Sequence, residues 1–155
     1  MKITIDKFLK DNLVCLQAIT WLRRYSDVKK AWVECPRADW MLWAISCYPA
    51  VQKRIGKRVF VVLALRFAER ALPHFEKWSP TDKKPRNAIL LVKKWLKNPR
   101  AVEHNDLSVA VSAMSAAADA VASAMYVTDA AADAAELKWQ ADQVRKLIPC
   151  PFNEN

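Results

Sequence analysis

Glycine is almost absent from this sequence, since Gly56 is the only one in 155 residues. Hairpin turns, β-bulges and phosphate-binding loops depend on glycine because it adopts positive φ without strain. A β-rich fold and a glycine-rich nucleotide site are therefore disfavoured. The strong helix formers Ala, Leu, Lys and Arg are abundant instead. The composition predicts an all-α protein.

Long apolar runs and export signals are also missing. The longest apolar run, residues 59–65, stops at Arg66, well short of the roughly 18 uncharged residues that a transmembrane helix needs. The start of the chain lacks the apolar core and cleavage site of a secretory signal. The four cysteines form no CxxC pair and have no nearby histidine, which is typical of reduced, buried thiols: Cys15, Cys35, Cys47 and Cys150. A disulfide framework or a zinc site is the less favoured alternative. We expect a cytoplasmic protein that binds no membrane, metal or cofactor.

Apolar residues recur every three or four positions along most of the chain, which is the spacing of amphipathic helices. Thirteen of the 31 residues from Asp106 to Glu136 are alanine, and such small side chains let helix axes approach closely. We expect one compact domain over residues 1–148, a bundle of about five to seven helices with the alanine-rich C-terminal helix packed centrally. Residues 149–155 are expected to form a flexible tail. The alanine pattern also permits a homo-oligomer through helix pairing.

Positive charge is concentrated in the first two thirds of the chain. Residues 1–100 carry a net charge of +14 and residues 101–155 carry −5, which gives +9 in total. Part of this imbalance is expected to be neutralised internally, and the remainder attracts an acidic protein, a nucleic acid or phosphate. The candidate partner-binding residues are the basic clusters after residue 50: Lys53, Arg54, Lys57, Arg58, Lys83, Lys84, Arg86, Lys93, Lys94 and Lys97. The first four have i, i+1, i+4, i+5 spacing, which presents four cations on one side if the segment is helical. A solvated surface, an acidic protein partner and nucleic-acid binding all stay open as their role.

Patterns that indicate catalysis are weak. His74 and His104 stand thirty residues apart without a local serine or cysteine partner. Asp129 and Asp133 share a helix face, as an acid–base pair or a divalent-metal site requires, but ion pairing with the basic helices is the simpler explanation. We expect a protein that is not an enzyme.

Three blocks of the sequence look familiar. The first leads through Trp32 and Cys35 into Asp-Trp-Met-Leu-Trp at residues 39–43; the second is residues 66–76. The third is Asp82 with Pro-Arg-Asn-Ala-Ile at 85–89, followed by an alanine-rich helix. Together they resemble a family of small all-helical immunity proteins found in bacteria and encoded by phages. The resemblance implies a protein that binds and neutralises a toxin, and it brings no defined active site.

Our leading hypothesis is a non-catalytic, protein-binding inhibitor, immunity-like or phage-encoded, that neutralises a toxin, host or defence protein by steric binding. Lys and Arg would steer it toward an acidic partner. The alternative is a basic nucleic-acid-binding accessory protein, whose affinity would fall steeply with salt. A protein inhibitor would depend instead on one or two exposed tryptophans as anchors. The sequence offers seven: Trp21, Trp32, Trp40, Trp43, Trp78, Trp95 and Trp139.

Overall fold

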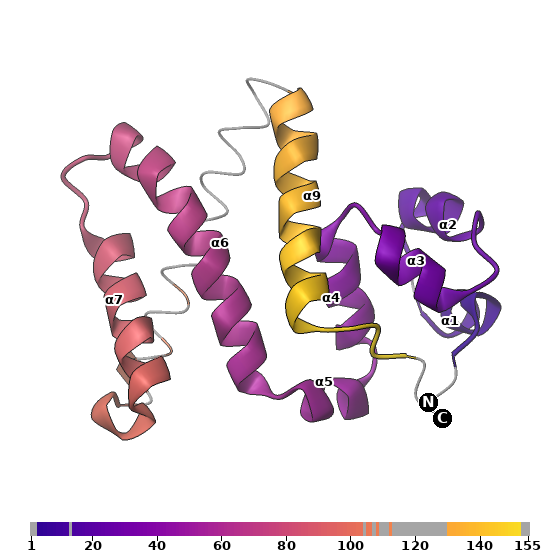
Figure 1. Cartoon of the computed structure of the whole chain (residues 1–155), viewed down its shortest axis with the longest axis horizontal. Coiled ribbons are helices and arrows are strands. Elements are labelled where there is room, and N and C mark those ends of the chain that lie inside the picture. The colour runs from indigo at the N-terminus through magenta and orange to yellow at the C-terminus, as the bar shows by residue number, and fades with distance from the viewer. Residues whose placement is uncertain are drawn as a thin grey trace. The chain divides into compact units, whose positions relative to one another are not determined.

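The computed structural model describes residues 3–12, 14–103, 105, 106, 108, 112 and 130–152. Every regular element in these ranges is helical, and none is a strand (Figure 1). They contain eight α-helices and one 3₁₀ turn, slightly more than the predicted five to seven. The predicted all-α class is therefore confirmed. None of the described helices combines the length and the apolar character that a membrane span requires.

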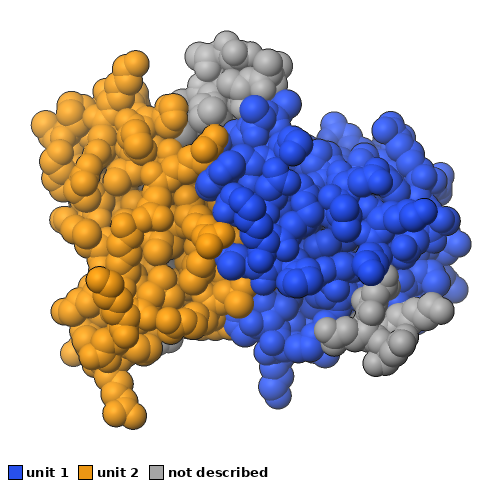
Figure 2. All heavy atoms as spheres, in the orientation of Figure 1, with its two compact units in different colours: residues 1–56, 134–155 blue, residues 57–133 orange. Residues whose placement is uncertain are grey.

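The chain divides into two compact units (Figure 2). Unit 1 comprises Met1–Gly56 together with Ala134–Asn155, and unit 2 comprises Lys57–Asp133. The single domain over residues 1–148 stays a prediction. The central packing expected of the alanine-rich stretch falls mostly on residues 107–129, which lie largely outside the described residues.

Unit 1 is built from short helices and the last long one. They are α1 (Ile5–Asp11), α2 (Leu16–Leu22), α3 (Val28–Glu34), α4 (Ala38–Ser46), α5 (Pro49–Ile55) and most of α9 (Ala130–Leu147). Two of these helices begin with a side-chain cap. Thr4 Oγ1 accepts the Lys7 N–H at 3.2 Å before α1, and Asp27 Oδ1 accepts the Lys29 N–H at 3.0 Å before α3. Each cap gives a partner to an N–H that has none within its helix.

The C-terminal segment completes the core of unit 1. The Trp32 indole N–H donates to the Ile148 carbonyl at 3.2 Å. Phe152 is only 3% exposed, and its ring centroid lies 5.7 Å from those of both Trp32 and Tyr48. The sequence predicts a tail from residue 149, but the packed core continues to Phe152, because this aromatic ring fills space against two others. Residues 153–155 lie outside the described part of the chain.

Arg145 attaches α9 to the end of α3. Its Nη1 donates to the Cys35 carbonyl at 2.6 Å and to the Trp32 carbonyl at 3.4 Å, and its Nη2 donates to Asp142 Oδ1 at 2.6 Å. The last carbonyls of a helix have no partner within the helix. The guanidinium supplies donors to this end of α3, while Asp142 holds it in place.

Unit 2 contains a helical hairpin followed by a short turn. Helix α6 (Lys57–Trp78) and helix α7 (Lys84–Lys97) pack against each other, and the 3₁₀ turn η1 (Pro99–Ala101) contacts α7. The buried contact consists of small and aliphatic side chains from both helices: Val61, Leu65, Ala68, Ala88, Ile89 and Val92. This core fixes which side of α7 is turned away from α6.

Candidate partner-binding site

Each end of α7 forms a hydrogen bond with a side chain of unit 2. The Asp82 carboxylate accepts the Lys84 N–H at 2.9 Å, and Pro85 stands in the first turn, where its missing N–H costs nothing. The sequence predicts Asp82 as the N-cap; that position belongs to Lys83, and Asp82 acts one residue earlier. At the other end, Arg58 Nη2 donates to the Leu96 carbonyl at 2.7 Å. These bonds fix both ends of α7 within unit 2.

The side of α7 opposite its buried contact carries four cations and one leucine, and we call these residues the α7 face. They are Arg86, Leu90, Lys93, Lys94 and Lys97, all exposed to solvent. At 3.6 residues per turn they occupy an arc of about 100° over a length of about 17 Å. Leu90 is 57% exposed and lies at the middle of this arc. The structure therefore brings four of the ten predicted residues together around an exposed apolar side chain.

Two cations of the α7 face are paired with glutamates of α6. Arg86 makes a two-pronged pair with Glu76, with Nε to Oε1 and Nη2 to Oε2 both at 2.6 Å. The hydrogen bond from Arg86 holds the pKa of the Glu76 carboxyl below its usual range. Lys93 Nζ lies 2.6 Å from Glu69 Oε1. These pairs orient both side chains and neutralise part of the charge.

Lys94 and Lys97 keep their charge available. Both are exposed, and neither has a carboxylate within 4.0 Å among the described residues. They stand in the last turn of α7, where the partial negative charge of the helix end favours a cation. Lys84 is also exposed but lies outside the arc, and Lys83 Nζ donates to the Pro80 carbonyl at 2.7 Å. The free charge of the α7 face is thus concentrated at its C-terminal end.

The remaining predicted cations do not form the one-sided set that a continuous helix would give. The pair Lys53–Arg54 ends α5 in unit 1, whereas Lys57–Arg58 begins α6 in unit 2. Gly56 separates them with φ at 82°, a backbone conformation that other residues rarely adopt. The helical condition behind the i, i+1, i+4, i+5 prediction is not met, because the single glycine ends the first helix inside the cluster.

Two of these cations have structural roles within their own units. Arg54 donates to the Pro151 carbonyl and so holds the C-terminal segment of unit 1. Arg58 donates to the Leu96 carbonyl, as described above. Lys53 and Lys57 are exposed. Basic residue type alone did not distinguish arginines that bind backbone carbonyls from lysines that stay in solvent.

The weak catalytic candidates gain no support from the described residues. His74 is exposed on α6, and no group of three His, Cys, Asp or Glu side chains in the described ranges could hold a metal ion. His104 and Asp129 lie outside the described residues, and so does the side chain of Asp133.

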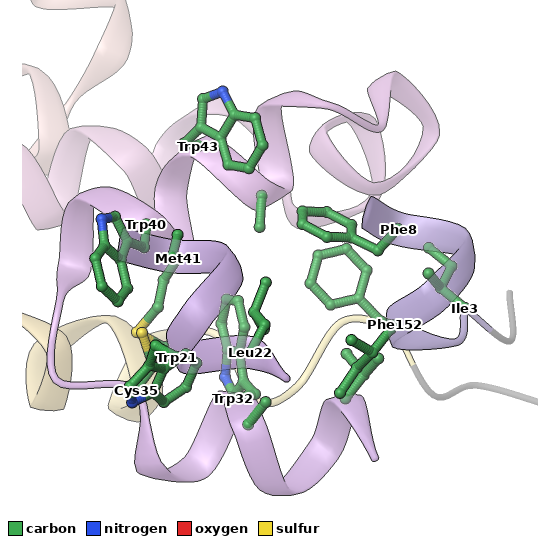
Figure 3. A pocket seen from close by; sticks show the side chains of 15 residues that line it. Ile3, Phe8, Trp21, Leu22, Trp32, Cys35, Trp40, Met41, Trp43 and Phe152 are labelled. Carbon is green, nitrogen blue, oxygen red and sulfur yellow. The ribbon is translucent and has the colours of Figure 1, made fainter. Parts of the chain in front are cut away.

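Unit 1 contains a cavity that no pattern in the sequence indicated. Side chains from α1 to α4 and from the C-terminal segment converge on it (Figure 3). Its free volume is about 60 Å³, and all of its lining residues are apolar or aromatic except Cys35. A sequence pattern shows that aromatic residues face a core, but it does not show where their packing leaves space. It likewise does not show that Trp78 is 78% exposed, as an interface anchor would be.

Comparison with known proteins adds nothing to this geometry: the chain matches no protein-family model, no curated protein and no solved structure. The likeness of its three sequence blocks to immunity proteins stays a prediction. The fold and the site together define a helical protein with a cationic, partly apolar helix face.

Proposed function

We propose that this chain is a non-catalytic binding protein that docks on an acidic protein through the α7 face. The observation that carries this proposal is Leu90, which is 57% exposed within a ring of cations on a helix that is held at both ends. Protein interfaces combine an apolar centre with a polar rim, and oppositely charged rims accelerate association. Lys94 and Lys97 supply the charge of the rim.

The same cations support a protein partner better than a nucleic acid. A surface that follows a phosphate backbone is lined by cations and polar groups, because phosphates carry most of the affinity. An aliphatic side chain at the centre of the face gains little against phosphates but is buried against another protein. In addition, the Lys53–Arg58 cluster does not continue as one helical array of cations.

Inhibition by steric cover is the form of binding that we favour. The resemblance of three sequence blocks to immunity proteins suggests a toxin, host or defence protein as the target. A pre-ordered helix loses little conformational entropy on binding, which favours tight association. No reacting group is needed for such a mechanism.

The test compares the tagged wild-type chain with two charge-matched double variants in a nuclease-treated pull-down from bacterial lysate. Lys94→Glu/Lys97→Glu reverses the free charge of the α7 face. Lys10→Glu/Lys146→Glu makes the same change in net charge at exposed lysines in the last turns of α1 and α9. Both variants therefore bear a similar free-energy cost for a negative charge in the last turn of a helix.

We expect one protein to be retained in stoichiometric amount through low-salt and moderate-salt washes by the wild type and by the Lys10/Lys146 variant. The Lys94/Lys97 variant should bind it about tenfold more weakly. Equal retention by both variants would refute the assignment of the α7 face. Material that disappears with nuclease would instead favour the nucleic-acid alternative.

A further inference from the structure

The cavity in unit 1 has the size of one aliphatic side chain. Its free volume is about 60 Å³. On this measure a water molecule needs about 10–15 Å³, so the space accommodates about four heavy atoms. A leucine side chain has four carbon atoms.

The chemistry of the lining selects an occupant without polar atoms. Buried side chains of Ile3, Phe8, Met41 and Phe152 contribute to its wall (Figure 3). The indole N–H of Trp32, which could have served a polar ligand, already donates to a backbone carbonyl. No buried side-chain N or O atom in the described ranges lacks a hydrogen-bond partner. An apolar group would restore dispersion contacts that the lining now lacks, whereas water would find no partner.

The rim of the cavity is formed by half-buried side chains. Trp21, Leu22, Val28 and Trp40 line the cavity and remain partly accessible to solvent. The rings of Trp21 and Trp40 lie 5.9 Å apart. Half-buried tryptophans beside a small pocket are typical of the surroundings of an interface anchor.

Four exposed cations adjoin this rim along the chain. The pair Arg23–Arg24 directly follows Leu22, and the pair Lys29–Lys30 directly follows Val28. None of the four side chains has a carboxylate within 4.0 Å among the residues that the structure describes. The occupant of the cavity is therefore expected to carry negative charge next to its apolar group.

We propose that the unit 1 cavity is an anchor pocket for one leucine-sized side chain, presented next to acidic residues of a protein partner. This inference rests on the proposed function only in taking the partner to be a protein, since it uses a different surface from the α7 face. The cavity supplies apolar contact, and the four cations attract the flanking carboxylates.

The test uses the full chain and a blocked pentapeptide with a single central leucine between two glutamates on each side. Proton NMR follows the leucine methyl groups, because aromatic rings around the cavity shift their resonances upfield. We expect a saturable upfield shift that the same peptide with alanine in place of leucine does not reproduce. This comparison needs no change to the protein.

Protein variants locate the binding. Ala44→Leu fills the cavity from its lining and should weaken peptide binding at least tenfold. Ala50→Leu, at an exposed position outside the lining, is the matched control and should leave binding unchanged. Lys29→Glu/Lys30→Glu should weaken binding severalfold at low ionic strength and much less at high ionic strength.

Each contrary result has a defined meaning. Equal binding of the leucine and alanine peptides, or no effect of Ala44→Leu, would overturn the inference. Isovalerate alone binding as tightly as the peptide would overturn the protein partner and assign the cavity to a small carboxylate. Saturable peptide binding in a chain that captures no protein from lysate would support the pocket while the proposed function fails.

Discussion

Replacing Arg145 with methionine tests whether its guanidinium holds α9 onto the end of α3. Methionine keeps most of the length and apolar volume of the side chain and removes every donor. The hydrogen bond to the Cys35 carbonyl at 2.6 Å is charge-assisted and accounts for most of the loss, about 1.5–3 kcal/mol. The 3.4 Å contact with the Trp32 carbonyl adds little, and the i, i+3 pair with Asp142 adds about 0.3–0.5 kcal/mol. We expect Arg145→Met to lower the free energy of unfolding by about 2–3 kcal/mol.

The assay is urea unfolding followed by far-ultraviolet circular dichroism. The midpoint should fall while the slope with denaturant stays the same, because the variant exposes the same surface on unfolding. Lys146→Met is the control, since this neighbouring lysine is exposed and should change stability by less than about 0.5 kcal/mol. Equal midpoints for Arg145→Met and Lys146→Met would refute the structural role of the guanidinium.

Further predictions concern the backbone, the thiols and acid stability. Gly56→Ala should cost about 1–3 kcal/mol in urea unfolding through its backbone alone, because φ is 82° and no atom lies within 4 Å of an added Cβ; an unchanged midpoint would contradict this. Brief iodoacetamide treatment should label exposed Cys15 before Cys35, whose thiol pKa is raised by burial, as mass spectrometry of peptides can show. Hydrogen bonds from Arg145 and then Lys138 lower the pKa of the Asp142 carboxyl. Its contribution to stability is present above its ordinary pKa of about 3.9 and is lost as pH falls through the lower folded value. Asp142→Asn should therefore flatten the loss of urea midpoint in acid, and an equally steep loss would show that this carboxylate contributes nothing.

Local signals in the sequence account for several of the helix ends. Thr4 and Asp27 each accept a hydrogen bond from an N–H that lies two or three residues later in the chain. Such a cap depends only on local sequence, so it can be predicted without knowledge of the tertiary structure. Asn98 directly follows the last residue of α7, as Asn-Pro predicts. Helix α5 is hard to predict from the sequence because it is only seven residues long and begins at Pro49.

The candidate site was predicted by residue type and only partly by arrangement. The lysines at 93, 94 and 97 fall on one face because helical spacing fixes them there once Ile89 and Val92 are buried. The exposure of Leu90 and the cavity in unit 1 depend on which tertiary neighbours are present, and no local pattern records that. The four cations of the Lys53–Arg58 cluster do not lie on one helix, because Gly56 ends α5 between the two basic pairs.

Unit 1 is built from two segments that are far apart in the sequence, and this has a consequence for synthesis on the ribosome. Trp32 and its partner Ile148 are separated by 116 positions, and the whole of residues 57–133 is made between them. Closing so long a loop carries an entropic cost, and contacts of high sequence separation form slowly. The first helices of unit 1 therefore cannot complete their core until residues 148–152 have been made. Until then Trp32 lacks its contacts with Ile148 and Phe152. A nascent chain therefore exposes the aromatic surface around Trp32 and Tyr48 until Phe152 has been made.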